Sequence, residues 1–274
     1  MRRINKIALY IVIIFYSILT FIPLWYVVNN AFKKKEFIIA NPYFLTSESF
    51  TFNSIVRAFN NMKYPQSLMN NIVILVFTCA LLIILGSLAG YSVVMSGSKL
   101  LKRYYIFSVM IITIPFQIVM VPLTSMMRSM NLVNTYAGVS LVFTAFSMPF
   151  VIFLYTGYMK TLPKELAEAA IVDGCGMFKT YLYIYMPLLQ VVTGTVLVLR
   201  GVTVWNDLLI PLVTISKSGM LPLSLKLYSY ASQRLSSWDL IFAGTFLVSL
   251  PITLLFLALQ RVFIQGVAAG AVKG

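Results

Sequence analysis

Long apolar runs separated by short polar connections make up most of the chain. Six of these runs are long enough to cross a bilayer, because a membrane-spanning helix needs about 20 predominantly apolar residues. Lipid cannot satisfy exposed backbone N–H and C=O groups, so each run is predicted to be an α-helix. The predicted spans are residues 7–28, 72–95, 105–126, 137–158, 188–210 and 240–263. The pattern predicts an all-α integral membrane protein with six transmembrane helices, forming a single domain over residues 1–274.

Prolines and glycines inside the runs predict how the helices bend and pack. Pro115 and Pro122 lie in the third span, and Pro149 lies in the fourth. A proline within a helix removes one N–H and frees a carbonyl, so these helices are expected to bend. A pore-lining bend and a merely structural bend both fit the pattern. Gly86 and Gly90 form a small-xxx-small pair, which predicts close packing of the second span against another helix.

Composition supports the membrane assignment. The 274 residues are 60% hydrophobic and 10% charged, with a mean hydropathy of +0.90, whereas about 25% of a typical soluble domain is charged. A net charge of +14 would suggest nucleic acid as the partner of a soluble protein. In this chain the cations flank apolar runs, as membrane topology favours. Membrane lipid is therefore the expected surrounding, and nucleic-acid binding is not expected.

The distribution of cations predicts the side on which the termini lie. Six spans place both termini on one side, and cytoplasmic segments usually carry the excess of Lys and Arg. With the termini inside, the inner segments hold eleven cations and the outer segments nine, and Arg200 completes the 21. The turn 98–104, with three cations and no acid, decides for cytoplasmic termini. Residues 7–28 are too long for a signal peptide and lack a cleavage site, so they are predicted to remain as the first span.

The longest connection, residues 33–71, is predicted to lie on the outer side. Part of it has apolar residues at helical spacing, which predicts a short amphipathic helix, and Tyr64-Pro65 is a turn signal. The apolar residues are Phe52, Ile55, Val56 and Phe59. This segment either contacts an external partner or caps the bundle, and the pattern favours neither.

The polar stretch between the fourth and fifth spans, residues 160–187, carries three of the chain's seven carboxylates. Its alanines predict a short helix, with Glu165 in the first turn and Gly174 at the end. One side of this helix is small and shallow, which suits close docking against another surface. That side consists of Leu166, Ala169, Ala170 and Asp173. The alternative is an ordinary surface helix lying on the membrane.

Polar residues within the spans are the candidates for a substrate pathway. They are Gln117 in the third span and Arg200, Asn206 and Asp207 in the fifth. An ionisable residue inside a span is costly in lipid and suggests a function. Arg200 and Asp207 share one helical face about two turns apart and could face one aqueous cavity. Alternatively, Asp207 lies at the outer interface and Trp205 is an interfacial anchor.

Several kinds of chemistry lack the residues that they need. No G-x-x-x-x-G-K-[ST] phosphate loop occurs, so ATP hydrolysis is not expected on this chain. There is no histidine, and Cys79 and Cys175 form no metal or disulfide pattern. Neither a metal site, a bound cofactor nor a His-activated nucleophile is therefore expected, and the chain is predicted not to be an enzyme. The missing histidines also argue against a proton-driven carrier.

The polar stretch also carries a family resemblance. It lies between two spans and resembles the EAA loop of ABC importer permeases, in which the loop forms a cytoplasmic coupling helix. The matching residues are Glu168-Ala169-Ala170, Asp173-Gly174, Ile184 and Pro187. Trp205-Asn206-Asp207 is similar to the Trp-Asn-Glu of the shorter permease subunit in the maltose-type carbohydrate branch, with Asp in place of Glu. The Gly-rich tail, residues 264–274, looks like the ending of that branch, so the likeness covers nearly the whole chain.

The resemblance implies half of the translocation pathway of a type I ABC importer in a bacterial cytoplasmic membrane. It implies a second, different permease subunit, two copies of a cytoplasmic ATPase that hold ATP and Mg²⁺, and an external sugar-binding protein. Oligosaccharide is the implied cargo, with polyols, sugar acids and glycerol phosphates also possible. The residues implied to couple to the ATPase are Glu165, Glu168, Ala169, Ala170, Asp173, Gly174 and Pro187. In the tail, the residues implied to reach the ATPase are Gly266, Gly270, Lys273 and Gly274.

The alternative class is a stand-alone channel or ion-coupled carrier, in which the Glu-Ala stretch is only a surface helix. Dependence on a separate ATPase distinguishes the two classes.

Overall fold

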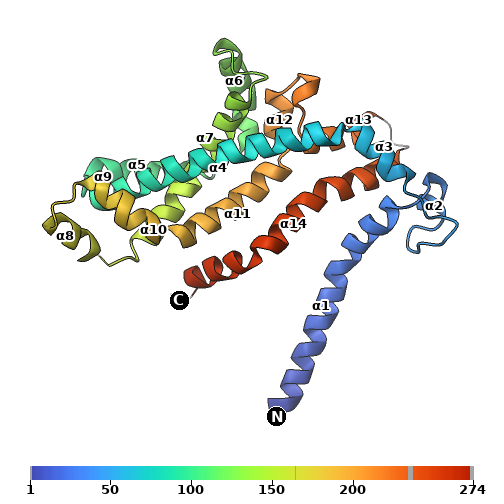
Figure 1. Ribbon diagram of the computed structural model, residues 1–274, viewed down its shortest axis with the longest axis horizontal. Coiled ribbons are helices and arrows are strands. Elements are labelled where there is room, and N and C mark those ends of the chain that lie inside the picture. The colour runs from blue at the N-terminus through green and yellow to red at the C-terminus, as the bar shows by residue number, and fades with distance from the viewer. Residues whose placement is uncertain (1, 164, 234–236, 272–274) are drawn as a thin grey trace. The chain divides into compact units, whose positions relative to one another are not determined.

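The computed structural model describes the fold of residues 2–163, 165–233 and 237–271 (Figure 1). Side chains are described for these ranges except at 2–5, 233 and 258–271. The named elements of the described ranges are all helices, which confirms the all-α prediction. The α-helices are α1 (Arg2–Ala31), α2 (Lys35–Ala40), α3 (Asn53–Asn61), α4 (Tyr64–Met95), α5 (Lys99–Ile111), α6 (Phe116–Ser129), α7 (Tyr136–Met159), α8 (Glu165–Val172), α9 (Met177–Thr180), α10 (Met186–Leu188), α11 (Gln190–Asn206), α12 (Leu209–Thr214), α13 (Leu223–Gln233) and α14 (Trp238–Ala271). A π-helix, η1 (Tyr181–Tyr185), and a 3₁₀ helix, η2 (Ser218–Met220), complete the described elements.

Four helices are long and apolar enough to span a membrane, namely α1, α4, α7 and α14. Two bent pairs of helices bring the number to six if each pair is one span. The prediction is closest at α7, where residues 137–158 were expected and Tyr136–Met159 is helical. Thr135 starts this helix, because its hydroxyl accepts a hydrogen bond from the Gly138 N–H at 3.0 Å. The turn predicted at Tyr64-Pro65 is wrong, since both residues begin α4, where a proline's missing N–H leaves no bond unmade.

The third predicted span, residues 105–126, is not one helix. α5 ends at Ile111, α6 begins at Phe116, and their axes differ by 107°. The break coincides with Pro115, whose ψ of 137° is extended, and a proline also disfavours helical geometry in the residue before it. Pro122 inside α6 and Pro149 inside α7 do not end their helices. Only one of the three prolines therefore breaks its span.

The fifth predicted span, residues 188–210, is interrupted near both ends. A bend of 71° separates Met177–Leu188 from α11, and α11 ends at Asn206. Asp207 is extended, with a ψ of 136°, and its Oδ1 accepts a hydrogen bond from the Ile210 N–H at 2.8 Å. A short acceptor side chain of this kind ends one helix and caps the next.

The chain folds into two compact units. The first comprises Met1–Ser67 and Leu223–Thr253, and the second comprises Leu68–Pro222 and Leu254–Gly274. In the first unit, Arg57 pairs with the buried Asp239 at 3.1 Å, and Tyr64 donates to the Leu247 carbonyl at 3.0 Å. The predicted amphipathic helix forms as α3. Its small residues Ser54 and Ala58 are buried, whereas the aromatic residues Phe52 and Phe59 are exposed.

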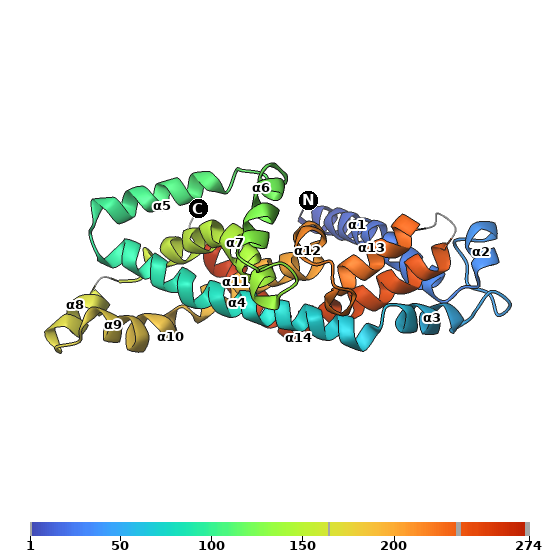
Figure 2. The same cartoon turned by 90° about the horizontal axis from the view of Figure 1, so that it is seen from above.

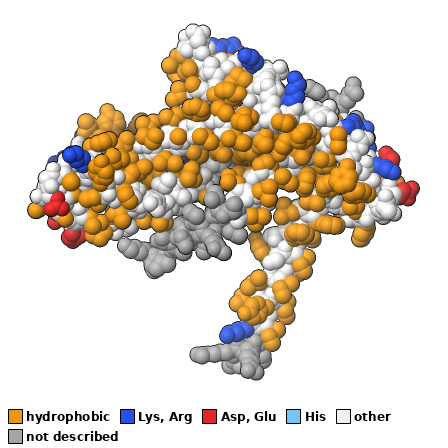
Figure 3. All heavy atoms as spheres, viewed as in Figure 1, with side chains coloured by type: hydrophobic (Ala, Val, Ile, Leu, Met, Phe, Trp, Pro, Cys, Tyr) orange, Lys and Arg blue, Asp and Glu red, His pale blue; other side chains and the backbone are white. Residues whose placement is uncertain are grey.

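The second unit is built around α4, α7 and α11, which run beside one another in both ribbon views (Figures 1 and 2). Gly86 and Gly90 of α4 face α7, where a β-carbon at Gly86 would overlap the Val151 side chain. A β-carbon at Gly90 would lie 2.9 Å from Cβ of Tyr155. The predicted close packing at this glycine pair is confirmed. The surface over α4 is largely apolar, as Figure 3 shows, and acidic side chains are seen both at the α8 end of the view and at the end with α2.

Candidate functional site

The polar stretch folds as predicted into a short helix with a defined end. Gly174 takes a left-handed φ of +77°, which glycine adopts without steric cost. Its N–H donates to the Ile171 carbonyl at 3.0 Å, and the Cys175 N–H donates to the Ala170 carbonyl at 2.9 Å. This pair of bonds is a Schellman motif, which satisfies the last carbonyls of the helix. The ending of α8 is therefore fixed by backbone geometry.

The side of α8 predicted to dock on another surface is divided in the structure. Ala170 is buried within the chain, and so is Ala167. Glu168, Ala169 and Asp173 are exposed. The expectation that Ala170 meets a partner is therefore wrong for its side chain, because the helix uses that position to pack on its own subunit. Glu165 and Gly174, by contrast, are exposed and accessible.

Apolar side chains are exposed beyond the carboxylates of this helix. Ile171 is 67% exposed and Val172 is 86% exposed. Phe178, at the start of the next helical turn, is 66% exposed. Large exposed apolar side chains beside carboxylates, at the tip of a segment outside the long apolar helices, indicate a surface that either another protein or the membrane covers.

A cluster of tyrosines joins the α8–α10 segment to α4, and we call Ser87, Tyr91, Tyr181 and Tyr185 the tyrosine joint. The hydroxyls of Ser87 and Tyr181 are 2.7 Å apart and hydrogen-bonded. Tyr91 donates to the Met177 carbonyl at 2.9 Å. The Tyr91 ring lies 5.3 Å from the Tyr181 ring and 5.1 Å from the Tyr185 ring, and all three tyrosines are buried. The joint therefore combines aromatic packing with two specific polar contacts.

Sequence patterns did not reveal this joint, because its members lie 94 residues apart. The local signal was the spacing of Ser87 with Tyr91 and of Tyr181 with Tyr185, four residues in each case, which places each pair on one helical face. Tyr181 and Tyr185 are also the first and last residues of η1, and single π-helical turns inside helices are frequent at functional sites.

Pro187 lies where the segment turns into α11. It is exposed within α10, and the following Leu189 is fully buried in the core that includes Tyr185 and Tyr155. The Tyr155 hydroxyl is 2.9 Å from Oγ1 of Thr193 in α11. The 71° bend is thus held on both sides by buried contacts.

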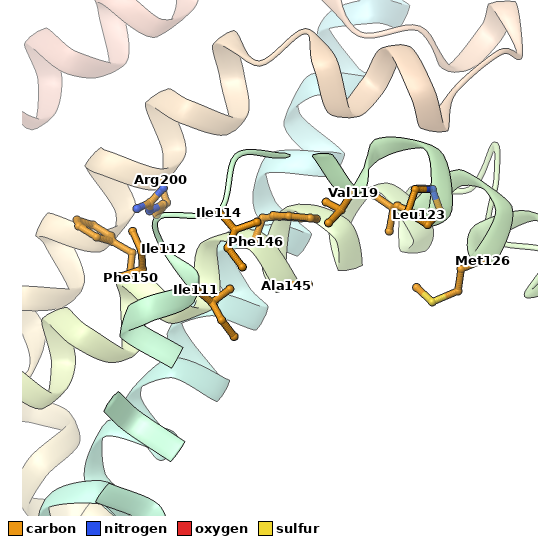
Figure 4. Close-up of a pocket in the computed structure, with 11 residues that line it drawn as sticks. Ile111, Ile112, Ile114, Val119, Leu123, Met126, Ala145, Phe146, Phe150 and Arg200 are labelled. Atoms are coloured by element: carbon orange, nitrogen blue, oxygen red, sulfur yellow. The ribbon is translucent and has the colours of Figure 1, made fainter. Parts of the chain in front are cut away.

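A second feature of the same unit is an open groove of about 550 Å³ at the break between α5 and α6 (Figure 4). It is lined by Ile111, Ile112, Ile114, Val119, Pro122, Leu123, Met126, Ala145, Phe146, Phe150 and Arg200. Arg200 is the charged member of this lining. Its guanidinium carbon lies 4.0 Å from the centre of the Phe150 ring, a cation–π arrangement. Its Nε is buried without a hydrogen-bond partner among the described residues.

Arg200 is the member of the predicted substrate-pathway set that lines this groove. Gln117 is exposed on the first turn of α6, outside the lining. Asn206 is exposed and donates to the Val202 carbonyl at 3.1 Å, while Asp207 caps α12. The idea that Arg200 and Asp207 line one cavity is therefore wrong for this groove.

Trp205 is buried, which contradicts its interpretation as an interfacial anchor, because the α11 face that carries it packs inside the subunit. In the tail, Gly266 and Gly270 fall within α14, whereas Lys273 and Gly274 lie outside the described residues. Within the described ranges, no group of three or more His, Cys, Asp or Glu side chains could hold a metal ion.

Comparison with known proteins identifies the chain. Residues 82–269 match the family described as "Binding-protein-dependent transport system inner membrane component". The chain belongs to this family. The permease is 34% identical to the melibiose/raffinose/stachyose import permease protein MelC of Bacillus subtilis, over 93% of this chain and 92% of that protein. It is 31% identical to the multiple sugar-binding transport system permease protein MsmG of Streptococcus mutans, over 99% of each.

A solved structure shares the permease fold. It is the crystal structure of a bacterial ABC transporter involved in the import of the acidic polysaccharide alginate. One of its chains aligns with a TM-score of 0.80 at 18% identity, over 94% of this chain and 96% of that one. The family is a non-catalytic membrane subunit of a transporter, so the stand-alone channel or ion-coupled carrier is no longer the alternative.

Proposed function

We propose that this permease is the shorter membrane subunit of an ATP-driven, binding-protein-dependent carbohydrate importer, and that α8 is its coupling helix. One observation carries the assignment of α8. It is a capped helix with exposed carboxylates and exposed Ile171 and Val172, anchored to the bundle through buried tyrosines. The partner at this surface is a separate cytoplasmic ATPase, present in two copies, which holds the ATP and Mg²⁺. This chain needs no cofactor of its own.

The contact residues on this side are Glu165, Glu168, Ala169, Asp173 and Gly174. Exposed carboxylates give the contact its charge, and Ile171 with Val172 give it apolar area. Residues 264–274 form a second contact with the ATPase pair. In this proposal each of the two bent helix pairs is one span. The chain then has six spans in one transmembrane domain, with both termini cytoplasmic.

The tyrosine joint supplies the mechanics of coupling. A force on α8 reaches η1 through α9, and the Ser87–Tyr181 contact passes it to α4. Buried aromatic packing of this density is not continuously deformable, so the segment moves as a body. Pro187 and Leu189 lie where that motion enters α11, which produces alternating access in the two permease halves.

Carbohydrate as the cargo is supported by the relatives, whose names describe permeases for melibiose, raffinose and stachyose and for multiple sugars. The second permease subunit completes the pathway, and an external binding protein delivers the sugar. Polar pathway residues on this chain are Arg200, Asn206 and Gln117, with Asp207 shaping the outer end of α11.

Co-purification tests the proposal. Gentle solubilisation from the native membrane at low salt should recover this chain with a P-loop ATPase and a second multispan subunit. Gly174→Val forces a β-branched residue into a left-handed conformation, which should deform the end of α8 and lose the ATPase while the second permease remains. Sugar uptake should then fall to background.

Two matched variants control this experiment. Gly97→Val places the same strain at a φ of +62° in the α4–α5 turn, and Gly176→Ala changes a glycine of ordinary φ two residues from Gly174. Both should retain the ATPase. If Gly174→Val kept full uptake and a bound ATPase, α8 would not be the coupling helix.

A further inference from the structure

The Arg200 groove holds a cation without a counter-charge. No Asp or Glu occurs in α4, α5, α6, α7 or α11, the helices that build this part of the second unit. The nearest acid in sequence, Asp207, bonds the Ile210 N–H instead. Within the described residues, the Arg200 Nε has no hydrogen-bond partner. The guanidinium therefore lies against the face of Phe150, and no carboxylate among the described residues of its unit pairs with it.

Such a position is expensive unless a ligand uses it. An ionisable side chain inside a membrane span is disfavoured by lipid, and a cation–π contact offsets only part of that cost. The low polarity of the surrounding walls also strengthens any attraction between Arg200 and an anion that enters. A guanidinium moreover presents several donors in a planar fork, which matches a carboxylate or a phosphate.

We propose that the Arg200 groove binds an acidic group on the transported sugar, so that this importer carries anionic carbohydrates, either uronates or sugar phosphates. The inference rests on the proposed carbohydrate import and adds the chemical class of the cargo. The cavity of about 550 Å³ lies in the size range of small-ligand sites.

The lining of the groove is compatible with a sugar that presents one acidic group to Arg200. Phe146 and the aliphatic side chains offer apolar surface to the C–H faces of a sugar ring. Because the groove is open, sugar hydroxyl groups can extend out of it rather than being buried without partners. Arg200 then provides the one strong polar contact (Figure 4). A site with a single strong contact suits a pathway, since cargo must leave it again.

The test uses the complete transporter, reconstituted in proteoliposomes. ATP is enclosed on the side of the ATPase subunits, and the binding protein is added on the other side. The cargo probes are matched pairs that differ in charge. Digalacturonate is compared with α-1,4-galactobiose, and trehalose 6-phosphate with trehalose, so that a carboxylate and a phosphate are distinguished. The wild type should import at least one acidic probe in preference to its neutral counterpart.

Arg200→Gln should reduce the ratio of acidic to neutral uptake by tenfold or more, as expected for a lost charge-assisted hydrogen bond. Arg200→Lys keeps the charge and should restore most of the ratio. Arg128→Gln is the matched control, because Arg128 is exposed on α6 outside the groove, and its ratio should not change. Since the readout is a ratio, a lower amount of assembled complex does not imitate the effect.

The possible failures are distinct. Import of the neutral probes alone, or equal losses for both probes in Arg200→Gln, would overturn the acidic-cargo proposal and leave sugar import standing. A further outcome is that Arg200→Gln loses the second permease subunit, while Arg200→Lys keeps the complex with an unchanged ratio of acidic to neutral uptake. The counter-charge of Arg200 would then belong to the second subunit, and the acidic-cargo proposal would be overturned. Absence of ATP-dependent import of any sugar would instead count against the proposed function.

Discussion

Two of the predicted membrane spans are interrupted, and the interruptions differ in what holds them. At residues 112–115 the chain turns by 107° between α5 and α6, and little of α6 is buried, since Met127 is the one residue of that helix that is buried. At Leu189 it turns by 71°, and Leu189 itself is fully buried beside the tyrosine joint. The first interruption leaves an open groove, and the second is filled by side chains. A break in a membrane helix thus leaves an open groove in one place and a filled connection in the other.

The contrast predicts that the rigid interruption is the more sensitive of the two. Tyr181→Ala removes a buried ring and its contacts with Ser87 and Tyr91. Truncation of a buried aromatic residue costs about 3–5 kcal/mol, because the cavity is not refilled. We expect a large fall in thermal stability in detergent and loss of sugar uptake. Tyr183→Ala is the control, since Tyr183 belongs to the same π turn and is 71% exposed. Equal effects of the two variants would remove the distinction between the interruptions.

A smaller change separates the polar contact from the packing. Tyr181→Phe and Ser87→Ala each remove one hydroxyl of the 2.7 Å contact, and each should cost about 1 kcal/mol of stability. The double variant should cost less than the sum of the two, because one interaction is lost once. If the contact transmits force, these variants should also raise ATP hydrolysis per sugar imported while the ATPase stays bound. An unchanged coupling ratio would limit Ser87 and Tyr181 to a structural role.

The smallest effect is expected at the open interruption. Pro115→Ala changes an exposed residue outside both helices, so the stability should change by less than about 1 kcal/mol, mainly through the unfolded chain. Accessibility of a cysteine introduced at Val119 should report whether the groove persists. A groove that closed in Pro115→Ala would show that the proline alone maintains the bend. In that case both bends would be held by local features, and the contrast between the two interruptions would be weaker than their packing indicates.

The sequence predicted some of these features well, for local reasons. The ends of α7 were predicted within one residue from the length of the apolar run, and the Thr135 cap fixes the same start in the structure. The end of α8 was predicted because Gly174 has the conformational freedom that a Schellman motif needs. A bend of the third span was predicted from Pro115, but its division into two helices at residues 112–115 was not, since hydropathy is continuous across the break. The inward side of α8 and the tyrosine joint depend on contacts between distant residues, which a local pattern does not encode.

The exposed tip of α8 also bears on how the cell handles the subunit. Ile171 and Val172 are 67% and 86% exposed, and they lie outside the helices that are long enough to span a membrane. If α8 is the coupling helix proposed above, this tip offers an apolar helix end to chaperones and proteases until the ATPase covers it. Subunits made in excess of their ATPase would thus be removed, and the amount of permease in the membrane would follow the supply of its partner. The same two side chains would then serve both assembly and quality control.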